Sequence, residues 1–466
     1  MTGRIPPDAR LRAAGRHVAP VALAVAGSLA LACASPQLTS RHRSAERSWQ
    51  EAATAAAPAA GEVDAFAGAS HLDRDALVRE VLRRNPSIRS ARWAWKAALA
   101  RYPQETSLDD PMLGYGLAPA SLGSSQVDAG HRVDLSQRFP FPGKLSLRGE
   151  VALAEAEAAE HDVAAVRLRL ATMASLLFDE LWVADRALAI NAEHLELLDE
   201  FLHIATARYE VGEASQQDPL QAEVELAHGL HRDVVLTTVR RVAREQLNVL
   251  LHRRPDLPLP PPPGAFELPA PEQAEREALV AEALRARPEL RALDARIAAR
   301  ESAVALARRE FLPDLTLMGA YDTIWQERDL QPFVGVQVNV PLRLERRRAA
   351  LDEAHARLAR AESERDGLED QVRFAVESGV DRLEEARHVL RLYESHLLPA
   401  ARDQVEAARA GFETGRNSFL ALIEAERNLR TTRFGREEAL ADVSRRSAEL
   451  ARAVGRIPGL REGEQP

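Results

Sequence analysis

The stretch HRVDLSQRFPFPGK, residues 131–144, decides the class of fold. Apolar residues at positions 133, 135 and 139 alternate with polar residues at 132, 134, 136 and 138. A period of two residues is typical of a β-strand with one apolar and one polar face. The surrounding sequence is rich in alanine, leucine, glutamate and arginine, which favours long helices. The fold must therefore combine isolated strands with long helices.

Three further segments show the same alternation. The first is centred on Leu113, Tyr115 and Leu117, the second is DLTLMGAY from Asp314, and the third is FVGVQVNVPL from Phe333. Each is about ten residues long, the length of a tilted membrane-spanning strand, with polar residues toward a water-filled lumen and valines toward lipid. An ordinary antiparallel sheet with one solvated face is the alternative. Because four strands cannot close a barrel and open edges are not tolerated in lipid, spanning strands require several chains. Three chains would supply twelve strands.

The helical segments are too long for a compact domain. One runs from about 145 to 209 without proline, and a second from about 345 to 412, with Gly367, Gly379 and Pro399 as weak points. At 1.5 Å per residue each is roughly 100 Å long, which predicts a coiled coil or a tube of helices. Shorter helices are expected at 86–102 and 216–252. A coiled-coil scaffold is the alternative from another class of protein.

The chain repeats itself at an offset of 203 residues. At this offset, within ARYEVGEASQQDPLQAEVEL and ARAGFETGRNSFLALIEAERNL, Tyr209 aligns with Phe412, Gly212 with Gly415, and Glu223 with Glu426. The predicted domains are a signal peptide at 1–33, an N-terminal extended segment at 34–71, repeats at 72–254 and 272–455, a proline-rich linker at 255–271 and a tail at 456–466.

The N-terminus carries arginines followed by about 15 apolar residues ending at Cys33. This pattern is that of a secretory signal. The ending ALAC resembles a bacterial lipoprotein signal, and the resemblance implies that Cys33 is acylated. An ordinary cleaved signal peptide with an incidental cysteine is the alternative.

The composition excludes several functions. The net charge of -9 argues against nucleic-acid binding, and the single cysteine excludes an internal disulfide. His228 and His231, three residues apart, are half of a zinc site at most, and the four methionines form no cluster. No nucleophile motif or phosphate loop is present. We therefore expect no cofactor, no catalytic residue, no resident metal and no enzyme activity.

Together, the duplication, the two Tyr/Phe-x-x-Gly-x-x-Ser turns and the Asn-Pro and Arg-Pro helix starts resemble the TolC-like outer-membrane efflux channel family over residues 72–455. The resemblance implies a mainly α fold with a small β part, in which a homotrimer forms a 12-stranded outer-membrane β-barrel continuous with a periplasmic α-barrel. It also implies two partners, a periplasmic adaptor protein and an inner-membrane pump. The stretch LSQRFPFPGK resembles members that serve heavy-metal pumps of the resistance-nodulation-division type.

The same resemblance places the periplasmic gate at the two turns. The candidate residues are Tyr209, Gly212, Ser215, Asp218, Phe412, Gly415, Arg416, Ser418 and Glu424. Asp218 matches a gate aspartate, whereas the equivalent position in the second repeat is Ala421 and the next acidic position is Glu424. Arg416 is a candidate partner of Asp218 or Glu424, although the family's gate arginine matches Asn417. The alternative without a gating role is that these are solvated turn charges, with Asp218 as a helix N-cap before Pro219.

We therefore expect a passive outer-membrane duct of a tripartite efflux pump that exports substrates, heavy-metal cations among them. Drug export and type I protein secretion are the alternative roles. The identity of the substrate is not readable from the sequence, because a wide water-filled tube needs few specific contacts.

Overall fold

The computed structural model describes residues 35–54, 66, 68–123, 125, 128–265, 268, 275–325 and 327–458. The chain divides into two compact units. The first contains the described residues of Met1–Thr54, Arg92–Glu160 and Ala292–Asp366, and the second contains those of Ala55–Ala91, His161–Arg291 and Gly367–Pro466. The lipidation candidate Cys33 lies outside the described residues.

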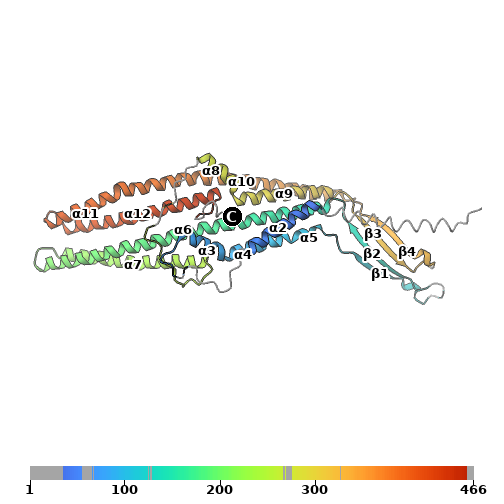
Figure 1. Ribbon diagram of the computed structural model, residues 1–466, viewed down its shortest axis with the longest axis horizontal. Coiled ribbons are helices and arrows are strands. Elements are labelled where there is room, and N and C mark those ends of the chain that lie inside the picture. Colours follow the sequence, from blue (N-terminus) through green and yellow to red (C-terminus); the bar gives the residue numbers. More distant parts are fainter. Residues whose placement is uncertain are drawn as a thin grey trace, which may run out of the picture. The chain divides into compact units, whose positions relative to one another are not determined.

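The order of elements follows the predicted duplication. The first half contains α3 (Arg74–Arg84), α4 (Pro86–Leu99), α5 (Arg101–Thr106), β1 (Met112–Leu117), β2 (His131–Phe139), α6 (Lys144–Glu210) and α7 (Gln217–Leu250). The second half contains α8 (Arg276–Ala286), α9 (Pro288–Arg309), β3 (Leu315–Asp322), β4 (Pro332–Val338), α10 (Leu344–Leu392), α11 (Leu398–Glu413) and α12 (Phe419–Val454). The hairpins α6–α7 and α11–α12 are the green and red pairs in Figure 1.

The four strands form one antiparallel sheet in the order β1-β2-β3-β4 (Figure 1). The register aligns Leu113 with Leu135, Leu135 with Gly319, and Gly319 with Val334. A row of apolar or small residues therefore crosses one face of the sheet, as the alternation predicts. β1 and β4 are the edges of the sheet.

Helix α6 runs for 67 residues, roughly 100 Å, because its sequence contains no proline and only one glycine. That glycine is Gly149, where a Cβ would lie 2.7 Å from Thr106 and 3.1 Å from Tyr102. The missing side chain thus lets α5 approach α6 closely.

The second rod is continuous but irregular. A π-helical turn, Tyr393–Leu397, joins α10 to α11 just before Pro399. Proline has no N–H for the preceding turn and its ring crowds the carbonyl there, which favours a local widening of the helix. Of the three predicted weak points, only Pro399 coincides with an irregularity, since Gly367 and Gly379 lie inside α10.

The segment after the apolar N-terminal run differs from the expectation. Pro36–Thr54 forms helix α2, whereas the sequence analysis predicted an extended segment at 34–71. The helix is stabilised by contacts within the first unit that are distant in sequence. Leu38 is buried with Tyr102, Ala152 and Leu153, and the indole of Trp49 donates a hydrogen bond to the carbonyl of Arg92. Lys96 forms an ion pair with Glu46 at 3.0 Å.

Two apolar cores hold the second unit together. One surrounds Trp182, Val376 and Leu440 and joins α6, α8, α10 and α12. The other joins the two hairpins, with Leu198, Phe201, Ala222, Phe419 and Leu422 at its centre. Small residues such as Ala222 and Ala425 allow the helices to approach closely.

Candidate gate at the helix turns and the strand–helix junction

Both predicted turns have the same backbone geometry. Gly212 and Gly415 have φ of 76° and 67°, the left-handed region that a residue without Cβ enters at least cost. In the first turn the N–H of Glu213 donates to the carbonyl of Arg208 at 2.9 Å, and in the second that of Arg416 donates to Gly411 at 2.8 Å. These are the bonds that end a helix in a Schellman turn.

The serines after the turns organise the next helices. Ser418 is the N-cap of α12 and its hydroxyl accepts from the N–H of Ala421. The Ser215 hydroxyl accepts from the N–H of Gln217 at 3.2 Å. The alternative interpretation of Asp218 as an N-cap is wrong, because α7 begins at Gln217 and Asp218 already lies within its first turn. The carboxylate of Asp218 still interacts favourably with the positive end of the helix.

The predicted latch does not form here. Within the described residues, no ion pair joins Arg416 to Asp218 or Glu424, and the Arg416 guanidinium donates instead to the hydroxyl of Thr414 at 3.1 Å. Glu424 is exposed and Asp218 is half-buried. These carboxylates are therefore solvated and available to a partner.

The two aromatic residues before the glycines differ in environment. Tyr209 is 43% exposed. Phe412 is half-buried, 5.6 Å from the ring of Phe419, and the Arg208 guanidinium lies 4.9 Å above its ring. Phe412 thus helps to fix the second turn against the first hairpin, whereas Tyr209 does not.

The hairpins are also joined by charges that the sequence analysis missed. Glu225 on α7 is buried and paired with Arg427 on α12, and this pair joins the two hairpins. Glu426 is also buried, but its pair with Arg409 of α11, at 3.4 Å, lies within the second hairpin. Burial raises the pKa of Glu426, although Arg409 opposes this. The repeat aligned Glu426 with Glu223, but Glu223 is exposed and the buried acid of the first repeat is Glu225.

The histidine pair lies in a cationic setting. His228 and His231 line a surface pocket with Arg232, Arg427 and Arg430. Among the described residues, no group of three or more His, Cys, Asp or Glu side chains could hold a metal ion. Neighbouring guanidinium groups also disfavour a cation at this position.

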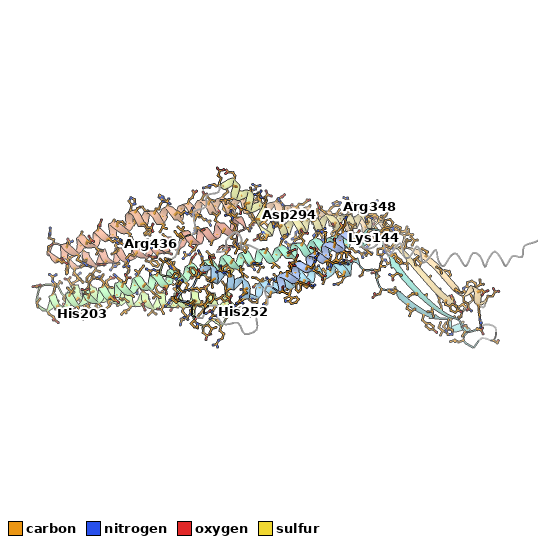
Figure 2. All side chains as sticks on the ribbon, viewed as in Figure 1. Lys144, His203, His252, Asp294, Arg348 and Arg436 are labelled. Carbon is orange, nitrogen blue, oxygen red and sulfur yellow. The ribbon has the colours of Figure 1, made fainter. Side chains whose placement is uncertain are left out.

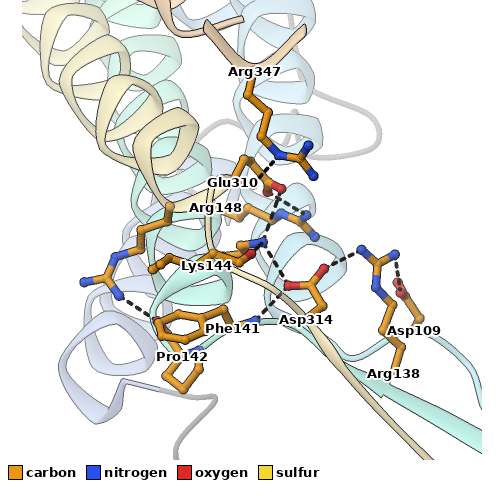
Figure 3. A network of polar contacts seen from close by, with 11 residues as sticks. Asp109, Arg138, Phe141, Pro142, Lys144, Arg148, Glu310, Asp314 and Arg347 are labelled. Carbon is orange, nitrogen blue, oxygen red and sulfur yellow. Dashed lines mark hydrogen bonds and ion pairs between the residues drawn. The ribbon is translucent and has the colours of Figure 1, made fainter. Parts of the chain in front are cut away.

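At the strand–helix junction, the end of the stretch 131–144 takes part in a buried ionic network at the start of α6 (Figures 2 and 3). The Lys144 side chain is 2% exposed, and its ammonium donates to Asp314 at 2.8 Å, to the carbonyl of Leu312 at 3.0 Å and to Glu310 at 3.3 Å. Asp314 also accepts from Arg138 at 2.6 Å and from the N–H of Phe141 at 3.0 Å. These contacts tie the end of β2 to the start of β3.

The geometry explains the order Pro-Gly-Lys. Gly143 has φ of 90°, and a Cβ there would meet the guanidinium of Arg309, which donates to the carbonyl of Pro142 at 2.6 Å. Burial alone would raise the pKa of Asp314, but hydrogen bonds from Lys144, Arg138 and Phe141 outweigh it and lower the pKa to about 2. The carboxylate therefore stays charged at all ordinary pH values.

One face of the sheet is apolar and exposed. Leu113, Tyr115, Leu135, Val334 and Val336 are each more than half exposed. The opposite face carries Arg132, Asp134 and Gln337, and Arg132 pairs with Asp134 at 3.6 Å. None of the helices in the described residues has a stretch long and apolar enough to cross a membrane.

Comparisons with known proteins agree with this architecture. A membrane protein from Pseudomonas aeruginosa has a TM-score of 0.72 at 20% identity, covering 87% of this chain and 97% of its own. VceC from Vibrio cholerae has a TM-score of 0.69 at 18% identity, and the match covers 82% of this chain and 96% of VceC. CusC, described as forming a transmembrane channel, has a TM-score of 0.68 at 17% identity, and the match covers 85% of this chain and 96% of CusC. No curated protein matches the chain significantly. The prediction of a mainly α fold with a small β part is confirmed.

The family described as outer membrane efflux protein matches residues 77–252 and 279–456, most of the chain and one segment in each half. The chain therefore belongs to the outer membrane efflux protein family, a family of channel proteins of the outer membrane.

Proposed function

We propose that this protein is the passive outer-membrane duct of a tripartite efflux pump, working as a homotrimer with a periplasmic adaptor protein and an inner-membrane pump. The observation that carries the proposal is the four-stranded sheet. It has an exposed apolar face, a polar opposite face and two open edges, β1 and β4. Such a sheet is stable in lipid only if its edges pair with those of other copies. Three copies close a twelve-stranded barrel whose polar faces line a water-filled lumen.

The helical parts extend this duct. In the proposal, the two repeats, 72–254 and 272–455, each give one long hairpin, and the hairpin turns form the periplasmic tip that meets the adaptor. Asp218 and Glu424 are the gate carboxylates, and Arg416 is the mobile cation that pairs with one of them in a closed state. The Arg416 contact with Thr414 is weak enough to exchange for such a pair.

An acylated Cys33 is the second membrane attachment in this proposal. The helix α2, only a few residues further along, packs against α4, α5 and α6 through Leu38 and Trp49. A lipid chain attached just before α2 would anchor the chain to the membrane close to this helix.

We propose heavy-metal cations as the first substrates to test, because LSQRFPFPGK resembles the metal branch of the family. The structure also gives this stretch a purely structural role, since Gly143 and Lys144 build the strand–helix junction. Drug export and type I secretion therefore remain the alternatives, and the stretch discriminates between them only weakly.

Deletion of the gene tests the function. We expect sensitivity to zinc, cobalt, cadmium or copper salts to rise, with the protein found in outer membranes as a detergent-stable trimer. Sensitivity to drugs alone, or loss of a secreted protein, would support the alternative roles and contradict the metal proposal. A folded monomer in the aqueous fraction would contradict the duct itself.

A further inference from the structure

A cavity of about 850 Å³ lies in the first unit, between facing sides of α9 and α10. Its walls carry seven arginines but only two acidic residues, Glu310 and Glu353. Alanines and leucines such as Ala303, Leu306 and Ala350 form the rest of the helix faces. A pocket of this size with so large an excess of one charge is a candidate site for the opposite charge.

Four of the arginines have carboxylate partners. Arg138 is paired with Asp314 at 2.6 Å, Arg300 with Glu155 at 3.6 Å and Arg357 with Glu353 at 2.5 Å. The fourth, Arg148, is 3.8 Å from Glu310. These arginines are largely neutralised and form the fixed part of the wall.

Of the other three arginines, Arg343 directly precedes α10, and Arg346 and Arg347 lie in its first turn together with the acidic Glu345. Arg347 donates to the backbone carbonyls of Glu310 at 2.8 Å and Arg343 at 3.5 Å. Within the described residues, Arg343, Arg346 and Arg347 form no ion pair with a carboxylate. Three cations within five residues repel one another, and cations in the first turn also oppose the helix dipole. An anion in the pocket would relieve both costs.

The alternation of the strands indicates which side the pocket faces. Arg138 lies on the same face of β2 as Arg132 and Asp134, opposite the exposed apolar Val133 and Leu135. Asn339, which also lines the pocket, continues the polar alternation of Gln337 after β4. Val340 and Leu342 also line the pocket, so it begins at the end of the polar side of the sheet, which faces water in the proposed barrel, and reaches across the connection to α10.

We propose that this basic pocket binds a small phosphate-bearing anion with two or more negative charges from the aqueous lumen. Guanidinium groups bind phosphate oxygens through paired, charge-assisted hydrogen bonds, and Arg343, Arg346 and Arg347 supply free donors of this kind. The assignment of the pocket to the lumen rests on the proposed duct. With one pocket per chain, each trimer has three such sites, close to the ends of the strands. Multiply charged anions would be retained there, and their release would depend on ionic strength.

Inorganic pyrophosphate is the probe for a direct test. Its binding to the purified full-length protein in detergent is measured by titration calorimetry at constant ionic strength. We expect one site per chain, and at least a tenfold weaker affinity in the double variant Arg343→Gln/Arg346→Gln. The control is Arg348→Gln, an exposed arginine of α10 that does not line the pocket (Figure 2). Equal binding by the parent and the double variant would overturn the proposal.

Two further measurements separate the site from the duct. Dihexanoyl phosphatidylglycerol carries the same phosphate chemistry on a lipid, and binding of this lipid without pyrophosphate binding would overturn the aqueous assignment. In planar bilayers, pyrophosphate should reduce the conductance of the parent but not of the double variant. A conducting pore that does not bind pyrophosphate would contradict the anion site but not the duct. Pyrophosphate binding without a conducting pore would contradict the duct but not the anion site.

Discussion

The strand–helix junction and the helix turns use charge in opposite ways. At the junction, Lys144 is 2% exposed and contacts three oxygen atoms, and Asp314 has three donors. At the turns, Asp218 and Glu424 are solvated, and no ion pair within the described residues holds them. The first arrangement fixes one geometry, because breaking it leaves buried charges unpaired. The second can change partners at little cost.

This difference suits the two tasks of a duct. The strands must keep their register and direction where they meet the helices, and a saturated network keeps them there. The gate proposed at the turns must be able to open, so its charges must exchange contacts easily. The five predictions below test whether the junction is structural and the turns are functional.

Lys144→Met should have the largest effect on stability. It leaves the carboxylate of Asp314 buried without its ammonium, which costs about 3–5 kcal/mol when a buried pair is broken. The measurement is the midpoint of thermal unfolding in detergent, followed by circular dichroism. Lys96→Met is the matched control, because the Lys96–Glu46 pair is partly exposed and should contribute about 1 kcal/mol or less. Equal losses from both variants would contradict a special role for the junction.

The same network predicts a dependence on pH. The folded pKa of Asp314, about 2, lies below its ordinary value, so its stabilisation is complete above about pH 4 and is lost as the pH falls from about 4 to about 2. The full loss should amount to about 2 kcal/mol, of which about half should be seen at pH 3. It is checked by comparing thermal midpoints at pH 6 and pH 3 for the parent and for Asp314→Asn. If the variant loses as much stability on acidification as the parent, Asp314 is not the group responsible.

The sequence predicts the strands, the repeat and the helix turns, but not the buried ionic network at the strand–helix junction. The period-two strands, the 203-residue repeat and the glycines of the turns are local or periodic signals, and the structure contains each as expected. The partners of Lys144 come from residues 310–314, more than 160 positions away, so only the folded chain identifies them. The helix α2 depends in the same way on Tyr102 and Arg92, which no local pattern indicates.

The repeat was misleading where its two copies differ in detail. It aligned Glu223 with the buried Glu426, yet the first hairpin buries Glu225 instead. Two residues along a helix correspond to a rotation of about 200° around its axis. A shift of two residues moves a side chain from one face of a helix to nearly the opposite face. Sequence equivalence therefore located the hairpins correctly, but not the buried acid of the first hairpin.

Glu225→Gln should loosen the contact between the two hairpins. The change leaves Arg427 without its carboxylate partner and should cost about 1–2 kcal/mol, because Glu225 is buried while Arg427 is partly exposed. The exposed Glu223→Gln is the control and should change the midpoint of thermal unfolding little. A higher frequency of spontaneous openings in planar bilayers for Glu225→Gln alone would show that this pair restrains the tip. Identical behaviour of the two variants would exclude that role.

Gly415→Ala should destabilise the second turn by about 1 kcal/mol. No atom lies within 4 Å of the added Cβ, so the cost comes only from the left-handed backbone at φ of 67°. Gly367→Ala provides a control of opposite sign, since Gly367 lies within α10 and also has nothing within 4 Å. Alanine there should stabilise the helix by about 0.5–1 kcal/mol. Thermal midpoints that move in the same direction would contradict the turn geometry.

Asp218→Ala combined with Glu424→Ala should have the smallest effect on stability and still change the pore. Both carboxylates lack ion pairs in the described residues, so their removal should leave the thermal midpoint within about 0.5 kcal/mol of the parent value. In a trimer each position supplies three negative charges, and such rings attract cations. The double variant should therefore lose cation preference in reversal-potential measurements, or leak more, whereas Glu223→Gln should do neither. Unchanged selectivity and gating would reduce the two residues to solvated turn charges, and the contrast between junction and tip would then be one of burial alone.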